Sequence, residues 1–503
     1  MECGGDCPCF SVGASAVCRE ASALMSAHPY SPPAMRGFQG IVFIMVIASV
    51  VIMLATPYYY LAFAPALLVI LILVLGKDPS PAYYLVVFLI PFDAYRGLGE
   101  GDYQFLTISK FAGILLLGVL FVHFVIDKRT LANLRSGLWI WLVFYFMAAF
   151  VSSLASDYGR ESLDNMTQLA TAIVFFGLTL YFTANRRSFL KTLPVVIVTG
   201  ISIGSALSII GYVFDIPLFI VHTEAETLKR GVGIGNDPNI FSAVVIFGLP
   251  LLAYYYFTAE NKVWKAAVIV LFALNVSSVV STFSRGGALI MLLVLSLLFM
   301  EHMKRFKPRQ LGFFVGLGAA VIVLIMLVVP SSYWSRQKSV AEPGDESIVR
   351  RTSYLYAGWD SFKENPVIGT GPGTFRYVFA ASPYVAYDTD KKEDYRRYAH
   401  NSYIEVLVGA GLVGFVFFFA PLILAFKGFI TARRRFRDNG DRDMYSATSA
   451  YMFCFFSMAV YFLIVSIQYH KFFWLTLGLS QAALILSGEA TAPAPVNHGA
   501  SRK

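Results

Sequence analysis

Long apolar stretches recur along the whole chain, with shorter polar segments between them. A helix that crosses a membrane needs about 20 apolar residues. Stretches that reach or approach this length lie at 39–55, 57–76, 82–92, 111–126, 138–155, 165–183, 192–214, 240–257, 266–282, 287–300, 311–330, 402–426, 446–467 and 472–487. Runs such as LLVILILVL lack the polar–apolar alternation of β-barrel strands. The pattern predicts an all-α fold, a polytopic membrane helical bundle of twelve to fourteen transmembrane helices.

The composition agrees with this class and excludes several others. Hydrophobic residues make up 57% of the chain and charged residues 14%, whereas soluble domains carry about 25% charged residues. So few charges do not cover a water-facing surface of this size. A soluble enzyme, a disordered scaffold and a secreted disulfide module are therefore excluded.

Basic residues are divided unequally between the alternating loops. Of the 40 lysines and arginines, 23 fall on one side of the predicted spans and seven in the short loops of the other side, while ten lie in segment 331–401. Short cytoplasmic loops carry the excess of basic residues. Both termini are therefore predicted to be cytoplasmic, with segment 331–401 outside. The net charge of +9 is then a sorting signal, not a nucleic-acid-binding surface.

The spans divide the chain into five predicted parts. These are a disordered cytoplasmic tail (1–38), the first part of the bundle (39–330), a large outer loop (331–401), the second part of the bundle (402–487) and a cytoplasmic tail (488–503). The first span acts as its own signal anchor, because residues 1–38 lack a basic segment followed by an apolar core. The cysteines of this tail match no paired zinc pattern, so we predict neither a metal nor a cofactor.

The outer loop 331–401 is expected to form a folded cap. Residues 348–364 form a helix-like stretch, which is followed by the turn cluster VIGTGPGTF and an aromatic stretch. Its nine acidic and ten basic residues nearly cancel. A connection of this length is usually functional.

Arginines at the outer ends of the spans are the first candidates for a site, because ionised groups at membrane depth are costly. Arg285 lies in a single short turn between two spans, and Arg230 lies in another outer loop. Arg350 and Arg351 are adjacent, so on a helix they point to different faces and at most one contacts a ligand. Arg285 has an alternative use as a helix cap or a lipid-headgroup contact, and Arg230 as an ordinary rim charge.

Three polar residues at the start of span 402–426 complete the candidates. His400 stands at the entry, and Asn401 and Glu405, four residues apart, share a helix face. Arginine binds phosphate oxygens through a two-pronged fork, and a histidine removes a proton from a hydroxyl near neutral pH. The combination suits a lipid-linked diphosphate leaving group displaced by a sugar hydroxyl. Alternatively, His400 caps a helix, and Glu405 holds Asn401 or an arginine in place.

Four segments in order resemble the O-antigen ligase and O-antigen polymerase superfamily of bacterial membrane glycosyltransferases. They are R-G-x-G-x-x-x-D-P-N-x-F at 230–241, F-S-R-G-G at 283–287, R-x-x-Y-x-x-x-x-W-D-x-F-x-x-N-P-V-I-G-T-G-P-G-T-F at 351–375, and H-N-S-Y-I-E-V-L-V-G-A-G-L-V-G at 400–414. The resemblance covers residues from about 200 to 420. It extends to the large outer loop that precedes the histidine motif.

The resemblance implies a metal-independent, inverting glycosyltransferase of the inner membrane. A glycan would pass from undecaprenyl diphosphate to an acceptor hydroxyl at the periplasmic face, with no nucleotide sugar. Arg230 and Arg285 would hold the diphosphate, His400 would activate the acceptor hydroxyl, and the loop that precedes His400 would shape the acceptor site. Arg351 is a further predicted substrate-binding residue. Asn401 and Glu405 complete the predicted substrate-binding set.

The sequence leaves several functions open. The acceptor is lipid A-core in an O-antigen ligase, or another lipid-linked repeat unit in a polymerase of O-antigen or exopolysaccharide. A protein O-oligosaccharyltransferase is a variant of the same chemistry. A transporter or flippase for the lipid-linked glycan is the alternative of another class. Charged residues deep in the spans, which a transport route needs, are nearly absent.

Overall fold

The structure, a computed structural model, describes residues 78–92, 108–127, 134–184, 186–223, 226–233, 235, 237–303, 346–387 and 396–489. The chain divides into two compact units, Met1–Asp78 and Pro79–Lys503, and the elements below belong to the second. The predicted spans 39–55, 57–76 and 311–330, the tail 1–38 and residues 490–503 lie outside the described residues.

The described elements follow one another in a single order. They are α4 (Ser80–Leu89), the 3-10 helix η2 (Ile90–Phe92), α5 (Ile108–Asp127), α6 (Leu138–Leu154), α7 (Gly159–Thr183), α8 (Arg187–Phe214), β1 (Ile220–Thr223), β2 (Glu226–Gly231), α9 (Pro238–Thr258), α10 (Lys262–Ser281), α11 (Arg285–His302), α14 (Glu346–Glu364), α15 (Phe375–Ala381), the 3-10 helix η6 (Pro383–Tyr387), α16 (Ser402–Asp438), α17 (Arg442–Tyr461) and α18 (Lys471–Glu489).

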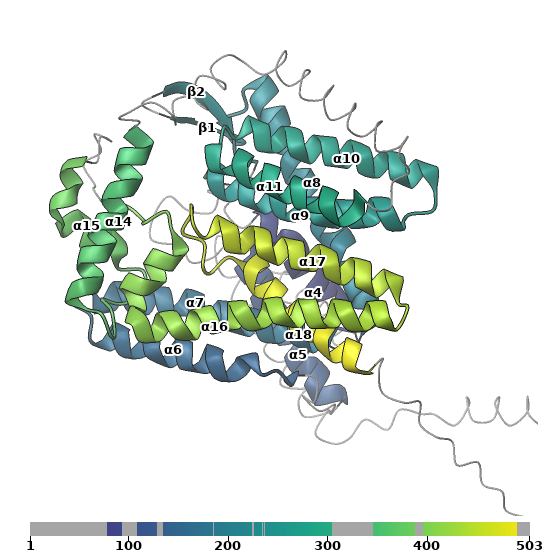
Figure 1. Cartoon of the computed structure of the whole chain (residues 1–503), viewed down its shortest axis with the longest axis horizontal. Helices are drawn as coiled ribbons and strands as arrows, with labels where there is room; N and C mark the ends of the chain where they lie inside the picture. Colours follow the sequence, from purple (N-terminus) through teal and green to yellow (C-terminus); the bar gives the residue numbers. More distant parts are fainter. Residues whose placement is uncertain are drawn as a thin grey trace, which may run out of the picture. The chain divides into compact units, whose positions relative to one another are not determined.

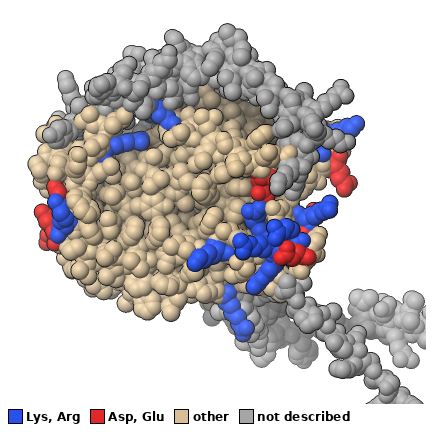
Figure 2. Space-filling view, viewed as in Figure 1, with Lys and Arg blue, Asp and Glu red and all other residues tan. Residues whose placement is uncertain are grey.

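Every predicted span within the described residues coincides with a helix, so the all-α membrane class is confirmed. Among the described helices, six are long and apolar enough to cross a membrane: α7 to α11 and α16. Large apolar side chains project outward from the bundle: Val270 of α10 is 66% exposed and Leu289 of α11 is 71% exposed. Apolar faces of this extent require a lipid environment. Figure 2 shows the corresponding broad uncharged surface.

Two predicted boundaries are wrong. The helix of the predicted span 402–426 runs past its predicted end, because α16 continues to Asp438 and turns only at Gly440 (φ 72°). The span predicted at 446–467 ends as α17 at Tyr461. The backbone after Tyr461 leaves the helix and pairs with the beginning of α16 instead.

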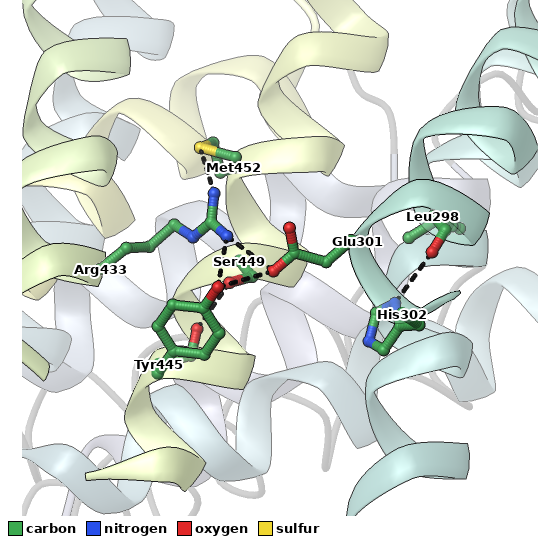
Figure 3. Close-up of polar contacts among 7 residues, drawn as sticks. All are labelled: Leu298, Glu301, His302, Arg433, Tyr445, Ser449 and Met452. Atoms are coloured by element: carbon green, nitrogen blue, oxygen red, sulfur yellow. Dashed lines mark hydrogen bonds and ion pairs between the residues drawn. The ribbon is translucent and has the colours of Figure 1, made fainter. Parts of the chain in front are cut away.

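An ion pair joins α11, α16 and α17 near the last turn of α11 (Figure 3). Arg433 Nη2 lies 2.6 Å from Glu301 Oε1 and donates to the Tyr445 hydroxyl at 2.8 Å. That hydroxyl donates in turn to Glu301 at 2.9 Å. The cluster lies at the opposite end of α11 from Arg285, and Arg433 belongs to the basic segment predicted to be cytoplasmic.

The predicted cap forms part of a small second core. Tyr354 and Ala357 of α14 and Phe375 and Phe379 of α15 are buried against Ala399 and Val408. Figure 1 shows α14, α15 and the β1–β2 pair at the same end of the long helices. The chain therefore brings α14, α15 and the β1–β2 pair, which belong to the two segments predicted to be outside, to one end of the long helices.

Candidate functional site

Arg230 is held in the two-stranded sheet that connects α8 and α9. β1 and β2 are antiparallel, with Arg230 opposite Val221. The side chain is only 7% exposed, and its Nε donates to the Thr282 carbonyl at 2.7 Å. The next residue must be glycine, because a Cβ on Gly231 would lie 2.3 Å from the Ser208 hydroxyl oxygen. Arg230 is thus fixed against the turn that carries Arg285.

The turn between α10 and α11 places Arg285 at the first position of α11. Phe283 has φ 51°, a left-handed conformation unusual for a non-glycine residue. The Ser284 hydroxyl accepts from the Gly287 amide at 3.1 Å and donates to Asn239 Oδ1 at 2.8 Å. The F-S-R-G-G segment is therefore tied directly to the D-P-N segment at the start of α9.

Asp237 supplies the negative charge of this region. It caps α9, and its Oδ1 accepts from the amides of Asn239 at 2.6 Å and Ile240 at 3.2 Å. Its carboxylate acts electrostatically on Arg230, Arg351 and His400, raising the pKa of each. Asp237 lies inside a quoted motif, but an aspartate before Pro238 has the sequence appearance of an ordinary helix cap.

Arg230, Arg285 and Arg351 form one electropositive group. Burial lowers the pKa of Arg230 to about 10, and Arg285 and Arg351 lower it further against the opposing effect of Asp237. Burial also lowers the pKa of Arg351, assisted by repulsion from Arg285. Three guanidinium groups from three separate segments are thus close enough to repel one another. The net charge of the three arginines and Asp237 is +2, which complements the negative charge of a diphosphate.

His400 lies beside this group in a tight turn. Its φ is 48°, and its ring stacks with that of Tyr354 on α14 at 6.0 Å between centroids. Burial lowers its pKa to about 4, Asp237 opposes this, and Arg351, Arg350 and Arg397 lower it further. The imidazole is therefore neutral at pH 7 and has a nitrogen lone pair that accepts a proton.

The two polar residues predicted beside His400 face the backbone of its turn. Asn401 Oδ1 accepts from the amides of Tyr403 and Ile404 at 3.0 and 3.1 Å. Glu405 is 3% exposed, and its Oε1 accepts from the Ala399 amide at 2.8 Å and from the Ser466 hydroxyl at 3.1 Å. Both side chains thus shape the entry to α16, and direct contact with substrate stays a prediction.

The residues after α17 complete the frame of the His400 turn. The Ser402 amide donates to the Phe462 carbonyl at 2.7 Å, and its hydroxyl donates to the Val465 carbonyl at 2.8 Å. The Ile467 amide donates to the same hydroxyl at 2.8 Å. This accounts for the early end of α17, because residues 462–467 serve as partners for α16.

The glycine cluster of the cap docks on a break in α16. Gly411 has φ 63° and ψ −169°, a conformation open essentially to glycine alone. Four backbone hydrogen bonds cross the junction: Thr370 to Val408, Gly371 to Gly409, Leu412 to Pro366 and Val413 to Val367. We call this contact between 366–371 and 408–413 the glycine junction. It fixes α15 and the cap to the helix that follows His400.

The comparisons agree with the motifs. Residues 267–419 match the family model described as O-Antigen ligase, a segment that includes Arg285, Arg351 and His400 and begins after Arg230. No curated protein matches the chain. The match supports the resemblance seen in the sequence to the O-antigen ligase and O-antigen polymerase superfamily, over residues 267–419.

Proposed function

We propose, on the premise of this domain, that the protein transfers a glycan from undecaprenyl diphosphate to an acceptor hydroxyl at the periplasmic face of the inner membrane. The observation that supports this most strongly is the grouping of the buried Arg230 and the partly buried Arg285 and Arg351 with one neutral histidine. In this proposal the site lies on the outer side and both termini are cytoplasmic. The positive-inside distribution of basic residues supports this orientation.

The proposed reaction is a single displacement at the anomeric carbon. A nitrogen of His400 takes the proton of the acceptor hydroxyl, and the hydroxyl oxygen forms the new glycosidic bond. The bond between the anomeric carbon and the phosphate oxygen breaks, and its electron pair stays on undecaprenyl diphosphate. Arg230, Arg285 and Arg351 stabilise that charge in a low-dielectric rim. Attack opposite the leaving group inverts the anomeric configuration. The step uses no metal or cofactor.

Donor binding also changes the pKa of the proposed base, His400. In the free protein, repulsion from Arg350, Arg351 and Arg397 helps to hold the pKa of His400 low. A diphosphate bound to the arginines adds negative charge and raises that pKa toward neutrality. A base is most effective when its pKa lies near the working pH, so His400 becomes a better base when the donor is in place.

The test is transfer by the purified full-length protein in proteoliposomes. The donor is an undecaprenyl-diphosphate-linked glycan, and the product is a longer glycan or a glycosylated lipid A-core. We expect His400→Ala to lose transfer by about 100-fold or more, the usual contribution of a general base, while protein level and membrane insertion are kept. The control is Arg160→Gln, an exposed arginine at the start of α7. Unchanged transfer by His400→Ala would refute the assignment of the base.

Ligase and polymerase share this chemistry, and a deletion strain separates them. Long chains stranded on the carrier lipid indicate a lost ligase with lipid A-core as acceptor. Carrier lipid capped with single repeat units indicates a lost polymerase.

A further inference from the structure

A second group of cationic and aromatic side chains adjoins His400 and is not used in the proposed reaction. Arg376 belongs to α15, and Tyr398 precedes His400 by two residues. The Arg376 guanidinium carbon lies 4.8 Å from the centre of the Tyr377 ring and 5.9 Å from that of Tyr398. Arg396 lies 5.8 Å from the Tyr377 ring. We call Arg376, Tyr377 and Tyr398 the Arg376 cluster.

Arg376 has unused hydrogen-bonding capacity. Its Nη2 donates to the Tyr377 hydroxyl at 2.9 Å, while its Nε is buried and has no partner among the described residues. No carboxylate among the described residues lies within ion-pair distance of it. Glu405 interacts with Arg376 electrostatically, but no hydrogen bond joins them: Glu405 Oε1 is bonded to Ala399 and Ser466, and Oε2 is buried without a partner among the described residues. A buried guanidinium nitrogen without a partner costs stability unless a ligand fills the position.

The surroundings of Arg376 indicate the kind of ligand. Tyr377 is stacked on Tyr158, the residue before α7, at 5.1 Å between ring centroids, which fixes its ring, and Tyr398 is 50% exposed. Aromatic faces bind the apolar faces of sugar rings, and a guanidinium fork binds carboxylate or phosphate oxygens. The cluster therefore fits a sugar that carries an anionic group.

The position of the cluster favours the acceptor over the donor. The diphosphate of the donor is assigned to Arg230, Arg285 and Arg351. The acceptor must bring a hydroxyl to a ring nitrogen of His400, and Tyr398 lies only two residues before His400 in the chain. We infer that the Arg376 cluster is an acceptor subsite that binds an acidic or phosphorylated sugar and presents its neighbouring hydroxyl to His400. This inference rests on the proposed function and adds the chemical class of the acceptor.

The experiment compares two soluble probes on the full-length protein in nanodiscs of uncharged lipid. The probes are trigalacturonate and a neutral galactose trisaccharide, and saturation-transfer NMR gives their dissociation constants. We expect the wild type to bind the acidic probe more tightly. Arg376→Gln should weaken that binding roughly 10- to 100-fold, as for a missing hydrogen bond to a charged group, and leave the neutral probe unchanged. Arg160→Gln is the matched control and should behave as wild type.

Three other results would overturn the inference. The first is a wild type that binds both probes equally, and the second is an Arg376→Gln variant that keeps the preference. In the third, phosphatidylglycerol in the nanodiscs displaces the acidic probe from the wild type but does not alter the binding of that probe by Arg376→Gln. This result would make the cluster a lipid-headgroup site. Undecaprenyl diphosphate binding is measured in the same samples. It should be normal in Arg376→Gln, and its absence from the wild type would refute the proposed function separately.

Discussion

Substitution of Gly411 by alanine tests whether the glycine junction holds the cap on α16. A Cβ at this position would lie 2.2 Å from the Val367 carbonyl oxygen and 2.7 Å from the Ile368 nitrogen. Both are backbone atoms, so the two segments must separate. The conformation itself, with φ 63°, costs an alanine about 1–3 kcal/mol.

The hydrogen bonds that break on separation set the size of the effect. They include at least the bonds from Leu412 to Pro366 (2.9 Å) and from Val413 to Val367 (3.3 Å). Each is worth about 0.5–1.5 kcal/mol. With the conformational cost, the junction is weakened by on the order of 2–6 kcal/mol. Since 1.4 kcal/mol corresponds to about tenfold, the junction should open roughly 30- to 20,000-fold more often.

Hydrogen exchange followed by mass spectrometry measures this opening locally. Peptides that contain 366–374 and 408–413 should exchange faster in Gly411→Ala, and glycan transfer should fall because α15 and the cap are released. The matched control is Gly113→Ala in α5, where a Cβ meets nothing within 4 Å. Gly369→Ala affects the same contact, so the double variant should be little worse than either single one. Unchanged exchange in Gly411→Ala would refute the described junction.

Three further predictions concern the site. Arg285→Lys keeps the charge but loses the fork, so transfer should fall roughly 10- to 100-fold; normal transfer would favour a lipid-headgroup contact. Because the pKa of His400 in the free protein is about 4 against an ordinary 6.5, its neutral form persists as pH falls to about 4. The pH profile of kcat/KM, which reports the free enzyme, should therefore show no loss of activity from protonation of His400 between pH 5 and 8. The profile of kcat, which reports the substrate complex, should lose activity through protonation of His400 at a higher pH than the profile of kcat/KM does. A loss of activity near pH 6.5 in both profiles would contradict this. Glu405→Ala should lower kcat about 5- to 100-fold by leaving the Ala399 amide unpaired, and Glu405→Gln, which keeps an acceptor oxygen, should recover most of it.

The sequence predicted the helices and the arginine candidates for one physical reason. Apolar length marks a span, and an ionised residue at the edge of a span, such as Arg285, departs from that pattern. His400 was found in the same way, by its place before a long apolar run. These signals are local, so one sequence suffices to read them.

The features that were missed depend on contacts between distant segments. Asp237 has the appearance of a helix cap, and only its proximity to Arg230, Arg351 and His400 indicates a second role. The break at Gly411 lies in an apolar run that has the composition of a continuous helix. Its partner, segment 366–371, is some forty residues earlier in the chain, and no pattern within either segment predicts the pairing.

Binding of undecaprenyl diphosphate to the purified protein decides whether the arginines form one donor site. We expect Arg230→Gln and Arg351→Gln each to weaken binding, by on the order of 10-fold or more, and the double variant to depart from additivity because the two groups share one ligand. His400→Ala should bind the lipid normally and transfer nothing. Normal affinity in both arginine variants, or transfer by His400→Ala at the wild-type rate, would contradict a single site built from these residues.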